Sequence, residues 1–193
     1  MGSSGRQGGS SQDTPAYPAS GYGLKSISVD PMSVQSNSAI SSGTIWASRL
    51  WIPAGVAITN LWAAVRTGGT HDGSTTPNRL GLYDDTGAQV ALTADDSTLW
   101  TAAGWRGGAL AGGPVAAQGA GRFVYVLWIV RGMTGLAMPF PVNANDANGP
   151  YASQGVGGGN RRTMYATGTS LPASFAPASY GTATGYVSLV GVS

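Results

Sequence analysis

The sequence predicts an all-β fold, an antiparallel β-sandwich or jelly roll with an extended N-terminal arm. Short apolar runs alternate with turns rich in Gly, Pro and Asn, and no window shows helical spacing between caps. All eight acidic residues are Asp and Lys25 is the only lysine, whereas exposed helices favour Glu and Lys. Because 42% of the residues are hydrophobic and six are Trp, the chain can build a core despite its 31 Gly.

Residues 1–43 form the predicted arm, in which Gly, Ser, Pro, Gln and Asn dominate. Such a composition cannot bury enough apolar surface to fold alone. Two short apolar runs, at residues 24–29 and 32–34, are candidates for strands that join the sheet edge of a partner. We therefore predict a docking arm, with a tethering linker as the alternative. The predicted partner-binding residues of the arm are Leu24, Ile27, Val29, Met32 and Val34.

Residues 44–193 form the predicted β-sandwich domain, which begins with two strands. Residues 44–52 alternate with a period of two and end at a Pro-Ala-Gly turn. Residues 56–67 follow with apolar side chains in the same period. The side chains expected to share one face are Trp46, Leu50 and Ile52 in the first strand and Val56, Ile58 and Trp62 in the second.

Six further runs complete the predicted domain. Residues 79–93 form a hairpin of two of them, because Asp84-Asp85-Thr86-Gly87 is a turn sequence in which Asp caps its own turn and Gly takes a positive φ. Residues 123–130 are apolar on both faces, which is typical of a central strand buried on both sides. Shorter strands are expected at residues 136–140, 162–167 and 186–192.

The chain offers few groups for enzyme chemistry. His71 is the only histidine, and Asp72 beside it suggests a Ser-His-Asp arrangement, but there is no Gly-x-Ser-x-Gly elbow and a Gly-flanked loop holds a base poorly. We predict that His71 lies in a surface loop. The Asp doublets at 84–85 and 95–96 could suggest glycoside hydrolysis, but neighbours in an extended chain point to opposite faces. We predict no catalytic residue, and a small hydrolase using the second doublet is the weakest hypothesis.

One segment resembles a metal site. Residues 143–149 place Asn and Asp side chains at alternating spacing before a Gly, like the start of a calcium loop. The segment has a single carboxylate, Asp146, and lacks the closing Glu, so any site would bind weakly. The Gly run at 155–159 lacks the Lys-Ser/Thr of a phosphate loop, and the chain has no Cys. We predict neither a metal nor a cofactor.

The tryptophans divide into two groups. Trp46, Trp62 and Trp128 lie in predicted strands and are expected in the core. Trp100 and Trp105 lie in a connection rich in Thr and Gly, where we expect them at an interface or a glycan contact. Flat rings stack on sugars, but subunit contact is the preferred interpretation.

Charge also restricts the partners. The net charge is +2 and the arginines are scattered, so the basic patch that nucleic-acid binding needs is absent from the sequence. No run approaches the ~18 apolar residues of a membrane span. Only 9% of residues are charged, against about a quarter in an average domain. We therefore expect surface to be buried in an assembly, most simply a homo-oligomer, and we expect neither nucleic acid nor membrane as a partner.

Several short motifs resemble a β-sandwich module of virion proteins from actinobacterial tailed phages. Their order matches that of the module over residues 43–193. The motifs are WIPAG at 51–55, LGLYD at 80–84 with TG at 86–87, a Tyr- and Val-rich strand at 121–130, and LP at 171–172 before a short final strand. The resemblance carries over no catalytic residue.

This resemblance implies a non-enzymatic structural protein of the virion. A short arm and one sandwich, without a collagen-like or coiled-coil stalk, suit a capsid decoration or minor capsid protein on the capsid surface better than a tail protein. The implied partners are the major capsid protein or other virion subunits, with a trimer as the expected homo-oligomer. The alternative is a tail-tip or fibre adhesion domain that binds carbohydrate of the host surface.

Overall fold

The computed structural model describes residues 19–28, 34–73, 75–141, 163–178, 182–183 and 189–193. Within them the chain consists of strands and turns, with one short 3-10 helix, η1 (Ala19–Tyr22). The strands are β1 (Ser26–Ile27), β2 (Val34–Ala39), β3 (Thr44–Ile52), β4 (Asn60–Val65), β5 (Thr70–His71), β6 (Arg79–Tyr83), β7 (Gln89–Leu92), β8 (Gly104–Ala109), β9 (Arg122–Val130), β10 (Met133–Thr134), β11 (Ala137–Pro141), β12 (Thr163–Thr167), β13 (Thr182–Ala183) and β14 (Val190–Val192). The predicted all-β class is confirmed.

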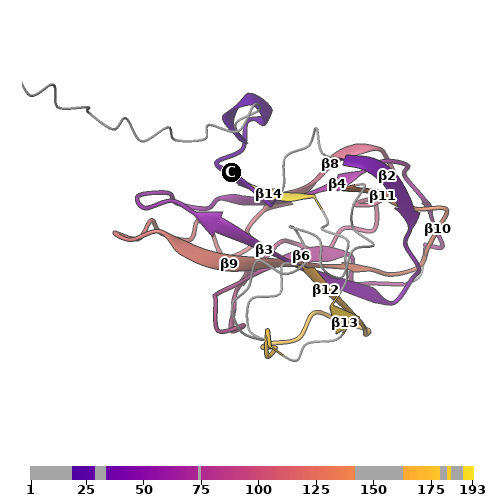
Figure 1. The fold of residues 1–193 in the computed structure, drawn as a ribbon. Coiled ribbons are helices and arrows are strands. Elements are labelled where there is room, and N and C mark those ends of the chain that lie inside the picture. Colours follow the sequence, from indigo (N-terminus) through magenta and orange to yellow (C-terminus); the bar gives the residue numbers. More distant parts are fainter. Residues whose placement is uncertain (1–18, 29–33, 74, 142–162, 179–181, 184–188) are drawn as a thin grey trace, which may run out of the picture.

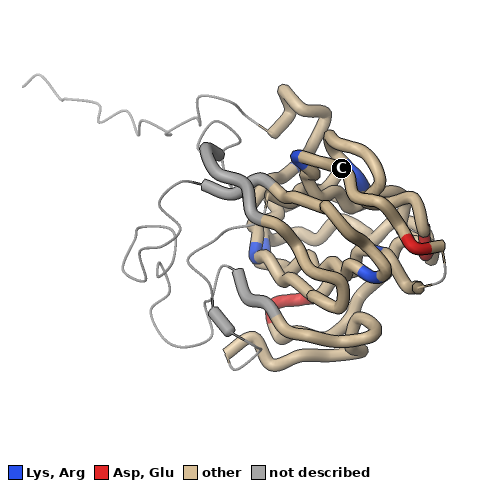
Figure 2. Tube along the Cα trace, turned by 90° about the vertical axis from the view of Figure 1, so that its right-hand side faces the viewer, with Lys and Arg blue, Asp and Glu red and all other residues tan. Residues whose placement is uncertain are grey.

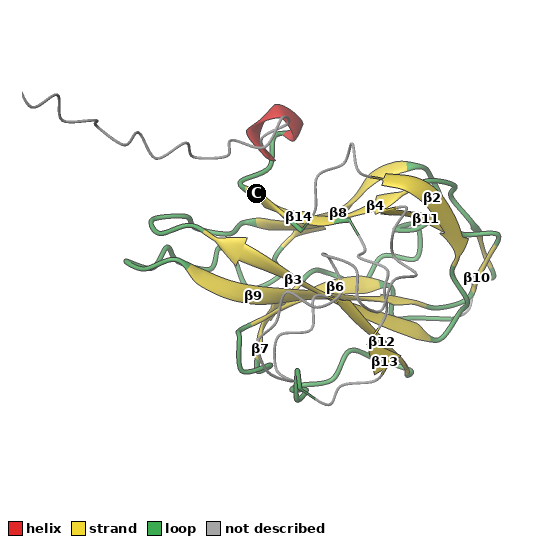
Figure 3. Cartoon of the chain, in the orientation of Figure 1, coloured by secondary structure: helices red, strands yellow, loops and turns green. Residues whose placement is uncertain are grey.

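Two sheets face each other (Figure 1). The larger sheet has six strands in the order β13-β12-β3-β9-β6-β7, and the smaller has four in the order β1-β14-β4-β8. Neighbouring strands in both sheets are antiparallel. Two small sheets, β11–β2 and β10–β5, lie at the right-hand end of Figure 3. This is the predicted antiparallel sandwich.

The main core lies between the two sheets, because alternate side chains of each strand point inward. Trp46 of β3 stacks on Trp128 of β9 with ring centroids 5.7 Å apart and an interplanar angle of 11°. The predicted inward face of β3 is confirmed, since Trp46, Leu50 and Ile52 all join this core. The four-stranded sheet contributes apolar side chains of β4 and β14 to the same core.

The centre of the six-stranded sheet is the pair β3–β9, in continuous register from Thr44↔Val130 to Ile52↔Arg122. β6 pairs with the other edge of β9. Residues 125–129 are therefore flanked on both edges, and residues 124–130 are buried, which confirms the predicted central strand. The predicted hairpin at 79–93 is also confirmed as β6–β7.

The inward face predicted for residues 56–67 is confirmed for Ile58, which is buried in the core, and for Val56, which packs against it, but it is wrong for Trp62. The strand begins only at Asn60, and Leu61, Ala63 and Val65 point into the core. Trp62 lies on the opposite face, where its Nε1 donates a hydrogen bond of 3.0 Å to Ser193 Oγ. The reason is an irregularity before the strand: the amides of two consecutive residues, 59 and 60, both donate to the carbonyl of Ser193, which shifts the alternation by one residue.

The described part of residues 1–43 belongs to the sandwich itself. β1 pairs with β14 at the edge of the four-stranded sheet, and β2 pairs with β11. Leu24 is buried, and the amide of Lys25 donates to the carbonyl of Val192 at 2.8 Å. Among the described residues before position 43, β1 and β2 therefore pair with strands of their own chain.

The turn between β6 and β7 follows the sequence expectation. Asp84 Oδ1 accepts hydrogen bonds from Thr86 N (3.0 Å), Thr86 Oγ1 (2.7 Å) and Ala88 N (2.9 Å). Desolvation alone would raise the pKa of Asp84, but these hydrogen bonds hold it below its usual range. Gly87 has a φ of 89°, a conformation that favours glycine. The carboxylate at 84 is thus explained by the turn.

Candidate interaction surface

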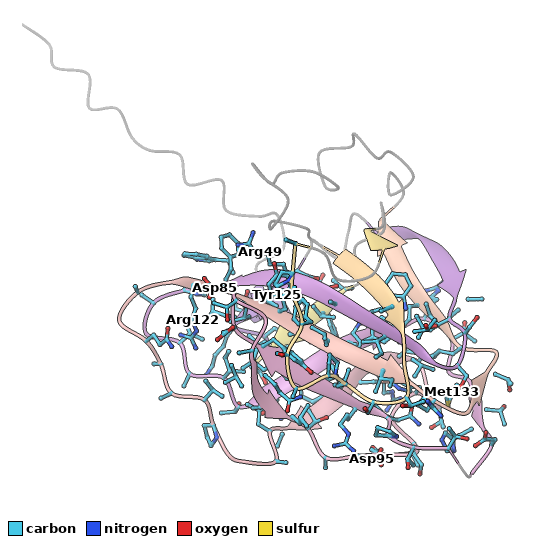
Figure 4. All side chains as sticks on the ribbon, turned by 90° about the horizontal axis from the view of Figure 1, so that it is seen from below. Arg49, Asp85, Asp95, Arg122, Tyr125 and Met133 are labelled. Carbon is cyan, nitrogen blue, oxygen red and sulfur yellow. The ribbon has the colours of Figure 1, made fainter. Side chains whose placement is uncertain are left out.

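The candidate site lies on the outer face of the six-stranded sheet, the face that points away from the four-stranded sheet. Odd-numbered residues of β3, β6 and β9 form this face, because alternate side chains of a strand point to opposite sides. One part of the face is covered by residues 168–178 of the same chain; over the other part, which we call the open part, none of the described segments packs as a cover. Figure 4 looks onto this face, with Arg49 and Tyr125 near its open end.

The covered part forms a second apolar cluster, separate from the core between the sheets. Phe175 is the centre of the cover, with its ring 5.4 Å from Tyr83 and 5.2 Å from Tyr125, both edge-on. Leu171 packs beside it. The sheet residues beneath the cover are Ile45, Ala47, Tyr83, Tyr125, Leu127 and Ile129, all buried. Aromatic pairs in this geometry stabilise a cluster beyond the area that they bury.

The covering segment is held by hydrogen bonds along the edge of β7. The amide of Gln89 donates to Ala173 O at 3.0 Å, and the amide of Phe175 donates to Gly87 O at 2.9 Å. The Tyr83 hydroxyl donates to Pro172 O at 2.6 Å. Burial raises the pKa of Tyr83, against a smaller opposing effect of the hydrogen bond with Gln89. The segment therefore extends the sheet edge and folds over the outer face.

The open part carries three side chains that we call the aromatic patch: Arg49, Trp51 and Phe123. Trp51 and Phe123 face each other across β3 and β9, and they are 47% and 40% exposed. Their rings meet edge to face with centroids 4.9 Å apart at 69°. The guanidinium carbon of Arg49 lies 3.8 Å from the centre of the Phe123 ring, within the range of a cation–π contact.

The patch is held in place by its surroundings. A Cβ on Gly121 would lie 2.3 Å from Cζ2 of Trp51, so the indole lies close against the backbone of residue 121, and a larger residue there would displace it outward. Arg49 also approaches the ring of Tyr125, at 5.9 Å from its centroid. Burial raises the pKa of Tyr125; the Arg49 charge opposes this rise and the Asp85 charge adds to it. The exposed rings are therefore fixed before any partner arrives.

This geometry fits recognition of a partner. Trp and Arg are the side chains that most often dominate the energy of protein interfaces, usually beside other aromatic rings in a central cluster. Rings that are already fixed lose little conformational entropy when they are buried. Figure 2 shows that the Lys and Arg positions of the described residues are spaced apart along the trace.

The two tryptophans predicted to be exposed have different positions. Trp100 is fully buried, its Nε1 donates to Ile129 O at 2.9 Å, and its ring lies 5.7 Å from that of Trp128. The expected surface contact of Trp100 is therefore wrong, because the Thr- and Gly-rich connection places the Trp100 ring in the main core. Trp105 lies in β8, a strand that the sequence did not predict, and is half-buried against Ile27 and Leu189.

The predicted arm residues are only partly described. Leu24 is buried and Ile27 is half-buried, both against their own domain, at the β1–β14 edge. Val34 lies in β2, which pairs with β11. Val29 and Met32 lie outside the described residues. The contacts of Leu24 and Ile27 are therefore intramolecular here, and a role in partner binding stays a prediction.

His71 lies in β5 and not in a loop. Its Nδ1 accepts a hydrogen bond from the amide of Gly73 (2.9 Å), so in the neutral ring the proton is on Nε2, which donates to Thr75 O (2.9 Å). Asp72 binds the amide and hydroxyl of Thr75, each at 3.0 Å. Both side chains thus order the connection that follows β5, beside a cavity of about 210 Å³.

The remaining polar candidates are structural or outside the described residues. Asp95 Oδ1 accepts from the amide of Asn78 at 2.7 Å, and Asp96 Oδ1 accepts from the amide and hydroxyl of Thr98 at 2.8 and 2.7 Å. The calcium-like segment 143–149 is not described. Within the described ranges, no three His, Cys, Asp or Glu side chains gather as metal ligands.

Comparison with known proteins gives no relative. No protein-family model matches the chain, and no curated protein matches it. In the described part of the chain, no helix has the length and apolar character needed to cross a membrane. The surface chemistry of the aromatic patch is therefore the basis for a functional proposal.

Proposed function

We propose that the chain is a non-enzymatic structural protein of a tailed-phage virion. It acts as a capsid decoration or minor capsid protein on the capsid surface, and it binds the major capsid protein or other virion subunits. The aromatic patch is the contact surface of the domain, and residues of the N-terminal arm provide a second contact. A homo-oligomer, with a trimer as the expected state, completes the proposal.

The observation that carries this proposal is an exposed aromatic patch that continues a largely apolar sheet face. Proteins rarely leave fixed aromatic rings exposed together without a partner. Trp51 and Phe123 sit beside a cationic side chain in the pattern of an interface centre. The all-β sandwich and the 9% charge content agree with the resemblance to virion modules.

Substitution of the patch tests the proposal. We expect Trp51→Ala to keep the fold and to lower self-association or binding to empty capsids at least about tenfold, the loss typical of an interface hot spot. The control is Val90→Ala, which removes another exposed apolar side chain, 46% exposed on β7. Light scattering and co-sedimentation with capsids measure the two effects. Equal binding by the full chain and Trp51→Ala would contradict the role of the patch.

A deletion that tests the role of the arm must be shorter than the compositional arm of residues 1–43. Removal of residues 1–40 would also remove β1 and β2, which pair with β14 and β11. Deletion of residues 1–18 leaves every described strand in place. We expect this deletion to weaken assembly while the thermal transition stays close to that of the full chain.

A second candidate function is carbohydrate binding by a tail-tip or fibre adhesion domain. The exposed indole of Trp51 favours it, because a fixed flat ring can stack on a sugar. Trp100 offers no such surface. Binding of the full chain to a panel of bacterial surface glycans, lost in Trp51→Ala and kept in Trp105→Ala, would support this function. A chain that binds capsids and no glycan would reject it.

A further inference from the structure

The covered part of the outer face indicates what this face binds. The covering segment reads Pro-Ala-Ser-Phe-Ala-Pro at residues 172–177. Its Phe175 ring packs edge-on against Tyr83 and Tyr125, and the carbonyl of Pro172 accepts from the Tyr83 hydroxyl. An extended, uncharged segment with one aromatic side chain between two prolines thus fits the aromatic residues of β6 and β9.

The chain contains a second segment of the same kind. Residues 15–18 read Pro-Ala-Tyr-Pro, again an aromatic residue between two prolines and without charge. Proline fixes its own φ and disfavours helical conformations of the residue before it, so such a segment is biased to extended conformations. The spacing is also that of a PxxP motif, a type of ligand that binds aromatic surfaces as a polyproline II helix.

We propose that residues 15–18 of one copy dock on the aromatic patch of a neighbouring copy. The proposal rests on the assembly function proposed above and names the occupant of its contact surface. The docked segment would cover the open part of the outer face as residues 172–177 cover the other part. Arm exchange of this kind joins copies through Arg49, Trp51 and Phe123.

The chemistry of the two surfaces is complementary. Trp51 and Phe123 offer ring faces and edges to the two proline rings and to Tyr17. Arg49 lies over Phe123 and adds a cation–π contact to the patch that the docked segment would cover. A segment stiffened by proline and a patch fixed against Gly121 both lose little entropy on binding.

The position of η1 favours docking on a neighbouring copy. Ala19 begins η1, which lies beyond the four-stranded sheet on the side away from the six-stranded sheet (Figure 1). The hydrogen bond from Ser26 Oγ to Trp51 O brings β1 close to the end of β3, but the side chains of the patch point to the opposite face of the six-stranded sheet. Four residues reach at most about 14 Å, so docking within one copy would need a sharp turn around this edge of the sandwich, and a patch on a neighbouring copy requires no such turn.

Photo-cross-linking between two forms of the full-length protein tests the proposal. One form carries a benzophenone amino acid in place of Tyr17, and the other is isotope-labelled throughout. We expect cross-linked peptides that join position 17 of the unlabelled copy to the labelled peptide containing Trp51 or Phe123. Cross-links confined to one copy, or directed to another surface, would overturn the proposal.

Paired substitutions give a second, independent measurement. We expect Pro15→Ala with Pro18→Ala, and separately Trp51→Ala, to raise the concentration for half-maximal self-association at least about tenfold. The matched control is Pro114→Ala, an exposed proline outside both segments. Unchanged self-association of the double proline variant would overturn arm docking. If this variant also still binds capsids, the proposed structural function stands; a full chain that binds neither itself nor capsids would defeat both.

Discussion

The outer face of the six-stranded sheet has two parts that share their strands and differ in their cover. At one end, Phe175 and its neighbours bury the face, and Phe175 itself is only 7% exposed. At the other end, Trp51 and Phe123 continue the same rows of β3 and β9 and remain 47% and 40% exposed. The two parts therefore carry the same kind of aromatic side chain, and they differ in whether residues 168–178 lie over them.

This comparison separates two kinds of contribution to the protein. In the covered part, aromatic contacts and hydrogen bonds to β7 contribute to the free energy of folding. In the open part, the same kinds of side chain contribute little to folding and are available for association. Substitutions matched between the two parts should therefore divide into effects on stability and effects on binding.

The largest expected effect on stability is that of Phe175→Ala. Removing a buried Phe ring that contacts Tyr83 and Tyr125 should lower the free energy of unfolding by about 3 kcal/mol. Phe123→Ala removes a half-exposed ring with one cation–π contact and should cost about 1 kcal/mol. Urea denaturation of both variants measures the difference. Equal losses would mean that the two parts of the face do not differ in their role in folding.

A pair of glycines gives a smaller and sharper contrast. A Cβ on Gly87 would lie 1.9 Å from Phe175 O, and its φ of 89° disfavours alanine, so Gly87→Ala should cost about 2 kcal/mol and loosen the cover. A Cβ on Gly121 meets only the indole of Trp51, which is exposed and can move outward.

Gly121→Ala should therefore change the unfolding free energy by less than about 0.5 kcal/mol. Its effect should appear in the environment of Trp51, as a red shift in tryptophan fluorescence, and as weaker association. Destabilisation of Gly121→Ala equal to that of Gly87→Ala would contradict the independence of the two parts.

The sequence predicted the elements that depend on local or periodic signals. Residues 123–130 are apolar at every phase, and the turn at residues 84–87 follows from Asp and Gly chemistry, so both were predicted. The phase of β4 was missed because one carbonyl, that of Ser193, binds two consecutive amides more than a hundred residues earlier in the chain. Such a long-range contact leaves no local pattern.

The exposure of the proposed contact surface could not be derived from the sequence for the same reason. Trp51 alternates with core residues of β3, so its outward direction could be derived from the strand, but its exposure depends on how far residues 168–178 extend over the sheet. Trp100 shows the opposite case, since its surroundings in sequence are polar and small while its ring is packed on Trp128. Tertiary packing decides both the exposure of Trp51 and the burial of Trp100, and a single sequence does not show this packing.

The smallest expected effect is alkaline destabilisation of the covered part. Burial raises the pKa of Tyr83 and Tyr125 above the ordinary tyrosine value of 10.0, so both bind their protons more tightly in the folded state than in the unfolded state. Their contribution to stability is then complete below pH 10 and is lost as the pH rises through the folded-state pKa values. Urea denaturation between pH 9 and pH 11, beside absorbance titration of tyrosinate, measures this loss.

The variant Tyr83→Phe with Tyr125→Phe should show a flatter alkaline profile, although it also loses the hydrogen bond from Tyr83 to Pro172 at every pH. An alkaline profile that is the same with and without these hydroxyls would mean that the tyrosines of the cover ionise as freely as those of an unfolded chain, and that the cover opens well below the global transition.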